Sequence, residues 1–284
     1  MKDFLFILLQ HLLPHHGISR VAGWLATTNI RWVKSLFIEK FSSHYSVNMS
    51  EAAEENLDAY SSFNDFFCRA LKPDARPITE GDNILACPAD GAISQLGNIE
   101  KDTIFQAKGK SFSATTLLGG DKALSERFSD GHFCTVYLSP KDYHRIHMPI
   151  TGKLVSMNHV PGALFSVNPA TVSNVDNLFA RNERVACIFE TEIGPVALVL
   201  VGAMIVASIE TVWAGEIAPR RNQVTHFQYQ THDEINLNKG EEMGRFKLGS
   251  TVILLLPKGA GNWVDRLTPG RTVTMGEPLF TLGD

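Results

Sequence analysis

The chain has 284 residues, of which 44% are hydrophobic and 20% charged, and this composition is that of a globular protein rather than a fibrous or low-complexity one. The length allows one large domain with an appendage, or two modest domains, and a sizeable core. A net charge of −4 provides no general basic field, so nucleic acid is not the expected partner. The charge is uneven, because residues 1–40 hold five basic residues against two acidic ones.

The N-terminus opens on an apolar run, Phe4 to Leu13, that Gln10 and His11 interrupt and Pro14 ends. The run is well short of the roughly 20 apolar residues that a membrane-spanning helix needs. A lone Lys2 is also a poor basic start for a signal peptide. We therefore expect neither a transmembrane segment nor secretion.

Two helices with apolar faces and basic flanks are predicted next. One begins near Ser19, whose hydroxyl can cap it, and the other covers Ile30 to Phe41. Apolar residues of the second helix fall at helical spacing: Ile30, Val33, Leu36, Phe37 and Phe41. Such helices either pack on a protein core or lie in the membrane interface, where anionic headgroups attract the basic residues.

Residues 50–80 are typical of a polar, helical connector that ends at Pro73 and Pro77. Beyond Ile84, short apolar runs alternate with glycine, proline and asparagine: Thr135–Leu138, Arg184–Glu190, Val196–Val201, Val252–Leu256 and Thr272–Thr274. Strands of this length without regular intervening helices predict a mainly antiparallel β core. The expected fold is α+β, with a helical region over residues 1–80 and a β-rich domain over 81–284.

Four cysteines are far apart and form no C-x-x-C pair, which argues against a zinc knuckle or a disulfide framework. They are Cys68, Cys87, Cys134 and Cys187. Buried free thiols in a reducing, cytoplasmic setting are the expectation.

Three segments carry residues suited to chemistry. In Leu248-Gly249-Ser250-Thr251, a glycine leaves its carbonyl open to the neighbouring hydroxyl at the entry to an apolar strand, although an ordinary turn also fits. The segment Asp142 to Pro149 contains His144 and His147, whose spacing of three lets both imidazoles share one face of a helix or tight turn. The two histidines could also be solvated side chains of a loop, or they could bind a metal, which would need a third ligand that the local sequence lacks.

The third segment is the turn Pro88-Ala89-Asp90-Gly91. Its aspartate either bonds its own backbone or orients an imidazole.

Together these segments resemble the bacterial phosphatidylserine decarboxylase family, pyruvoyl enzymes that make phosphatidylethanolamine. The segments are Leu248-Gly249-Ser250-Thr251, Ser139 to Pro149 and Ala89-Asp90-Gly91. Further stretches that look similar are Leu178 to Arg184, Val201-Gly202-Ala203, Ile209 to Gly215 and Gly244-Arg245-Phe246. The similarity covers nearly the whole chain.

The resemblance implies a proenzyme that cuts itself between Gly249 and Ser250. Ser250 is then the nucleophile and the source of the pyruvoyl group, His147 the base and Asp90 the residue that orients it. The products are residues 1–249 and 250–284. The amine of phosphatidylserine is expected to form a Schiff base with the pyruvoyl carbonyl, which accepts the electrons left by departing carbon dioxide. No metal is required.

The resemblance also implies His144 as the group that reprotonates the substrate carbanion. Ser166, in the apolar stretch from Leu164 to Val167, is either a residue that touches substrate or a plain strand serine. A phospholipid substrate favours membrane contact for the N-terminal helices, at the cytoplasmic face and without spanning. The resemblance also implies a homodimer, in which each subunit consists of the two cleaved fragments.

Two alternative functions remain, one for a different enzyme and one for a protein without activity. A serine hydrolase built on Asp90, His147 and Ser250 predicts an intact chain, and no G-x-S-x-G elbow surrounds the serine. A membrane-bound β scaffold without activity leaves the clustered histidines unexplained.

Overall fold

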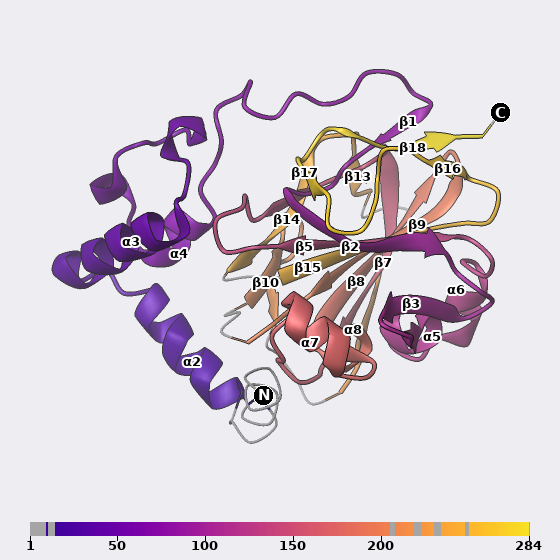
Figure 1. Cartoon of the computed structure of the whole chain (residues 1–284), viewed down its shortest axis with the longest axis horizontal. Helices are drawn as coiled ribbons and strands as arrows, with labels where there is room; N and C mark the ends of the chain where they lie inside the picture. Colours follow the sequence, from indigo (N-terminus) through magenta and orange to yellow (C-terminus); the bar gives the residue numbers. More distant parts are fainter. Residues whose placement is uncertain are drawn as a thin grey trace.

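A computed structural model describes residue 10 and residues 15–204, 208–218, 223–229, 234–247 and 250–283, with Ser250 described by its backbone alone. Helices come first and sheets follow (Figure 1). The predicted α+β class with a mainly antiparallel β core is confirmed. The apolar run from Phe4 to Leu13 lies outside the described residues except for Gln10.

The described part of the N-terminal region contains two longer helices, one short helix and two 3-10 turns, which lie to one side of the β core (Figure 1). They are α2 (His15–Ala26), α3 (Arg31–Tyr45), η1 (Met49–Glu51), η2 (Leu57–Ala59) and α4 (Phe63–Phe67). The prediction that Ser19 caps a helix is wrong, because α2 already includes His15 and places Ser19 one turn inside. The start of α2 is held instead by its contact with the β core, where the Leu164 amide donates to His15 Nδ1.

Helix α3 confirms the helix predicted over Ile30–Phe41 and runs four residues further. Its apolar residues divide between two environments. Ile38 is fully buried and Phe41 packs beside it on α4. Leu36 and Phe37 remain about half exposed, at 44% and 45%. The predicted apolar face is therefore only partly covered by the protein.

The connector over residues 50–80 is less helical than predicted. Asparagine and serine side chains bond amides two or three residues ahead, as Asn48 does with Ser50, Asn56 with Asp58 and Ser62 with Asp65. These local bonds compete with a continuous helix and end each turn early. The result is two 3-10 turns and the five-residue α4.

The β core is built on a nine-stranded antiparallel sheet. Its strand order is β12-β7-β8-β9-β15-β5-β2-β17, with β13 also paired to β7. Strands predicted from apolar runs appear as β5 (His132–Leu138), β8 (Arg184–Thr191), β9 (Gly194–Val201), β15 (Ser250–Leu256) and β17 (Thr272–Val273). The others are β2 (Gly91–Asn98), β7 (Gly152–Val160), β12 (Thr225–Gln228) and β13 (Asn236–Leu237).

Three smaller sheets and four short helices complete the described fold. A four-stranded sheet has the order β11-β10-β14-β6, a three-stranded sheet has the order β1-β18-β16, and β3 pairs with β4. Their bounds are β1 (Ile84–Ala86), β3 (Thr103–Ala107), β4 (Lys110–Ser113), β6 (Arg145–His147), β10 (Ser208–Thr211), β11 (Gly215–Ala218), β14 (Glu242–Lys247), β16 (Gly261–Trp263) and β18 (Pro278–Leu282). The helices are α5 (Ala114–Leu117), α6 (Lys122–Glu126), α7 (Pro169–Asn174) and α8 (Leu178–Arg181).

The central strands of the large sheet are buried on both faces. In β15, Val252, Leu254 and Leu256 belong to one hydrophobic cluster, while Ile253 and Leu255 belong to the cluster on the other face. A strand covered on both sides reads as a continuous apolar run rather than an alternating one. This explains why the run from Val252 to Leu256 was recognisable in the sequence.

Truncation of a central core residue is expected to destabilise the fold. Val199→Ala, at a fully buried position of β9, removes two methyl groups and leaves a cavity, at a cost of about 2 kcal/mol. Val212→Ala is the matched control, because Val212 is 47% exposed and its truncation costs roughly nothing. Urea unfolding measures both, and equal losses would contradict the assignment of β9 to the core.

Candidate active site

Ser250 is the first residue of β15 and pairs with Leu138 of β5. The residues before it, Leu248 and Gly249, lie outside the described residues. They connect Lys247, the last residue of β14, to β15. Since β14 belongs to the four-stranded sheet and β15 to the large sheet, the predicted cleavage point separates two sheets and interrupts no described strand.

His147 lies on β6, and both of its ring nitrogens have partners. Nδ1 donates to the Gly240 carbonyl at 2.8 Å, since a carbonyl only accepts, and Nε2 accepts from the Tyr143 hydroxyl at 3.0 Å. The imidazole therefore carries its proton on Nδ1 and its lone pair on Nε2. Burial lowers the pKa of His147, which keeps the ring neutral near pH 7.

Tyr143 is the residue that faces this lone pair. Burial raises the pKa of its phenol to about 12, so the hydroxyl stays protonated and remains a donor. Tyr143 belongs to the recognised segment, but no role was predicted for it. Gly240 was also missed, because it contacts His147 through its backbone from 93 residues away.

His144 is fully buried, and its ring lies 4.0 Å from that of Phe67 in α4, measured between centroids. Nδ1 donates to the Asp142 carbonyl at 2.8 Å, and no group among the described residues hydrogen-bonds to Nε2. Burial, with a smaller contribution from Arg69, lowers the pKa of His144 to about 3. The imidazole is consequently neutral at pH 7, with its lone pair on Nε2.

The predicted shared face of a helix or tight turn for the two histidines is not observed. His144 ends a turn that begins at Ser139, where Asp142 accepts from the Ser139 amide and hydroxyl at 2.7 Å each. The chain then extends into strand β6, which pairs with β14. The strand forms because β14 supplies backbone partners, which outweighs the local preference for a turn.

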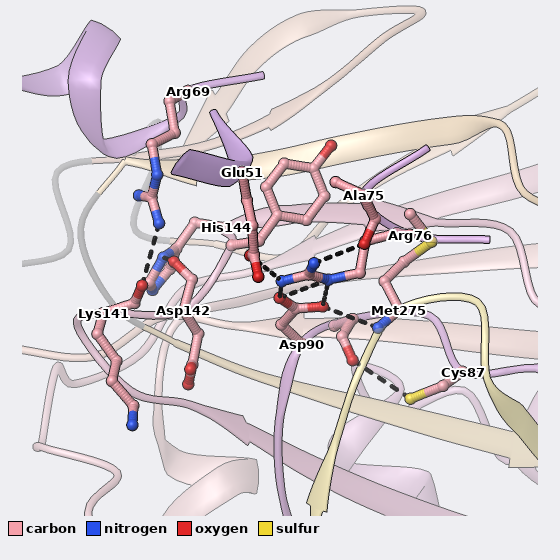
Figure 2. Close-up of polar contacts among 12 residues, drawn as sticks. Glu51, Arg69, Ala75, Arg76, Cys87, Asp90, Lys141, Asp142, His144 and Met275 are labelled. Carbon is pink, nitrogen blue, oxygen red and sulfur yellow. Dashed lines mark hydrogen bonds and ion pairs between the residues drawn. The ribbon is translucent and has the colours of Figure 1, made fainter. Parts of the chain in front are cut away.

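Asp90 is held by groups other than His147. Arg76 contacts both carboxylate oxygens, with Nε at 2.9 and 3.0 Å and Nη2 at 2.6 Å, and the Met275 amide donates to Oδ1 at 2.8 Å (Figure 2). Among the described residues no hydrogen bond joins Asp90 to His147. The two are linked through the backbone, because the His147 amide donates to the Pro88 carbonyl.

Ser166 lies in the loop between β7 and α7. Its amide donates to Gln10 Oε1 at 2.8 Å, and the neighbouring Phe165 ring packs edge-on against His15 of α2 at 4.8 Å. The loop that carries Ser166 is thus in contact with the N-terminal helical region. The sequence contained no sign of this contact.

All four cysteines are free and buried. Over the part of the chain that the structure describes, no group of three or more His, Cys, Asp or Glu side chains is arranged to hold a metal ion.

Comparison with known proteins identifies the family. A family model described as phosphatidylserine decarboxylase matches residues 63–281, and a second, described as PSD, matches residues 5–46. The chain belongs to the phosphatidylserine decarboxylase family. The family resemblance of the sequence motifs is thereby confirmed.

Relatives in this family match along their full length. The phosphatidylserine decarboxylase proenzyme of Saccharophagus degradans is 58% identical over 282 residues, which is 99% of each chain. Proenzymes of Pseudomonas putida and Marinobacter nauticus are 57% and 56% identical, over at least 98% of each chain. Similarity of this extent includes the N-terminal helices as well as the β core.

The buried His144 should make the stability of this family member depend on pH. Its pKa is lowered on folding, so its contribution is present above the unfolded value of about 6.5 and is lost as the pH falls towards 3. Between pH 8 and pH 5 the loss is about 2 kcal/mol.

Urea unfolding at both pH values tests this, in a Ser250→Ala background so that one polypeptide is measured. His144→Gln should reduce the difference between the two pH values by about this amount. An unchanged difference would show that His144 is not buried as a neutral ring.

Proposed function

We propose that the chain is a self-processing phosphatidylserine decarboxylase that is cut between Gly249 and Ser250. The observation that carries the proposal is the position of Ser250, at the start of a buried strand and directly after the link between two sheets. The relatives' name of proenzyme supports processing. Full-length similarity supports the same activity in this chain.

In the proposed cleavage, Ser250 attacks the Gly249 carbonyl and His147 takes the hydroxyl proton. The Nε2 lone pair of a neutral His147 suits this role, because a base must be unprotonated at the start. The Gly240 carbonyl fixes the ring tautomer, which is the task that a carboxylate performs in a serine protease triad. Asp90 acts on His147 through space, where its negative charge favours the protonated imidazole.

Strand pairing supports two fragments that stay together after cleavage. Residues 250–283 contribute β15, β17 and β18, and each pairs with a strand from residues 1–249. Strand β15 alone pairs with β5 over seven residues and with β9 over five. The new chain end at residue 250 would therefore stay beside Leu138.

The pyruvoyl group proposed at residue 250 supplies an electron sink for decarboxylation. The group derives from Ser250, so residue 250 must stay in place after its covalent link to Gly249 is cut. The pairing of β15 with β5 on one side and β9 on the other supports this. His144 and Ser166 are proposed to act on substrate. His144 is neutral, and its Nε2 is proposed to relay a proton from solvent water to the substrate carbon that loses carbon dioxide.

We further propose that α2 and α3 rest on the cytoplasmic face of the membrane. Large apolar side chains are exposed along them: Val21, Trp24, Trp32, Leu36 and Phe37. Helix α3 carries basic residues as well as exposed apolar ones, and this combination suits the surface of an anionic bilayer. Within the described residues, no helix has the length and apolar character needed to cross a membrane.

The same proposal includes phosphatidylserine as the membrane partner and a homodimer of the cleaved pair. Family likeness supports both. No role for nucleic acid is proposed, given the net charge of −4.

Denaturing mass spectrometry of the purified protein tests processing. We expect two fragments, residues 1–249 and 250–284, the smaller blocked to amino-terminal sequencing because it begins with a ketoacyl group. Ser250→Ala should remain one chain and release no carbon dioxide from phosphatidylserine. A single wild-type chain that is sensitive to serine-directed phosphonates would favour a hydrolase instead.

Co-sedimentation with vesicles that contain anionic phospholipid tests the membrane surface. Phe37→Ala should weaken binding about fivefold, because it removes a half-exposed ring worth about 1 kcal/mol at an apolar interface. Phe105→Ala is a matched control, since Phe105 is equally exposed at 44% but lies on β3 of the β core. Equal effects of the two changes would remove α3 from the proposed membrane contact.

A further inference from the structure

The side chain of Arg76 hydrogen-bonds to both oxygens of the Asp90 carboxylate. The guanidinium binds both oxygens through Nε and Nη2, and the pair is largely removed from water, with side-chain exposures of 13% for Arg76 and 7% for Asp90. A planar guanidinium that meets a carboxylate along one edge fixes both its direction and its rotation. The Met275 amide completes the set. Asp90 therefore has a single, fully bonded orientation.

Arg76 is itself held from the N-terminal region. Its Nη2 also donates to Glu51 at 2.9 Å, and its Nη1 donates to the Ala75 carbonyl at 2.7 Å (Figure 2). Glu51 is in turn fixed by its backbone, because the Lys72 amide donates to its carbonyl. The chain of contacts runs from η1 through Arg76 to Asp90.

At its other end, this chain of contacts reaches Met275, which follows the proposed cleavage point in the sequence. Met275 belongs to residues 250–284, whereas Glu51, Arg76 and Asp90 belong to residues 1–249. The carboxylate is thus bonded by both fragments that cleavage would produce. Its orientation depends on the small fragment as well as on the N-terminal region.

We infer that Arg76 is a positioning residue for self-cleavage, which fixes Asp90 so that its charge acts on His147. The inference rests on the proposed function. It accounts for the absence of a direct Asp90–His147 bond, because both carboxylate oxygens are already bonded. Loss of the guanidinium frees Asp90 to rotate and leaves its buried charge without a counterion.

The experiment measures the half-time of precursor cleavage after cell-free synthesis of the full chain. Arg76→Gln should slow cleavage at least about tenfold, because a bidentate charged contact is lost. Arg76→Lys keeps the charge but not the two-point contact and should fall between Gln and wild type. Methylguanidinium should partly restore cleavage in Arg76→Ala, which a general loss of folding would not allow.

Arg127→Gln is the matched control. Arg127 also pairs with a carboxylate, Glu190, at 2.6 Å, but both side chains are about 40% exposed at the surface. Its cleavage half-time should match that of wild type.

Two outcomes separate the inference from the proposed function. If Asp90→Asn blocks cleavage but folded Arg76→Gln cleaves at the wild-type rate, the role of Arg76 is wrong and the proposed function stands. If wild type itself is never cut at Ser250, the proposed function fails. Thermal melting in the Ser250→Ala background verifies that each variant is folded.

Discussion

The pairing of β15 between β5 and β9 is the constraint on which the site depends. Seven residues of β15 pair with β5 and five with β9, and side chains on both faces of the strand are buried. A strand held in this way cannot shift by one residue without moving its apolar side chains to the opposite face. The position of Ser250 relative to Leu138 is therefore set by the whole core rather than by local turn geometry.

The same core determines the protonation of the two histidines. A protonated imidazole is costly in an apolar surrounding, so burial lowers the pKa of both His144 and His147. Backbone carbonyls of Asp142 and Gly240 then fix which nitrogen carries the proton. Neutral rings with defined lone pairs follow from desolvation and two backbone contacts, and no carboxylate in the described part of the chain hydrogen-bonds to either ring.

Much of the β core could be predicted from the sequence, because strands buried on both faces appear as continuous apolar runs. The runs from Arg184 and from Val252 give β8 and β15 within two residues of their observed bounds. Candidate residues of the site came from short motifs and a family resemblance. Histidine, aspartate and serine can take part in proton transfer by their side-chain chemistry, so these candidates can be recognised without knowledge of their neighbours in the fold.

The partners of those residues could not be predicted in the same way. Arg76 lies in a loop, 14 residues before Asp90, and no periodic pattern links them. Gly240 acts through its backbone, which carries no residue-specific signal. The connector over residues 50–80 is also less helical than its sequence predicts, because hydrogen bonds to the side chains of Asn48, Asn56 and Ser62 end its helices early.

Helix α3 packs on the rest of the protein with one set of apolar residues and exposes another set. Ile38 and Phe41 of α3 pack on the α4 cluster, which also contains Phe67, the ring in contact with His144. Leu36 and Phe37 face outward. One side of α3 therefore supports the wall of the site while the other remains available to an apolar surface. A change on the inner side of α3 would reach His144 through two layers of aromatic packing, whereas a change on the outer side would not.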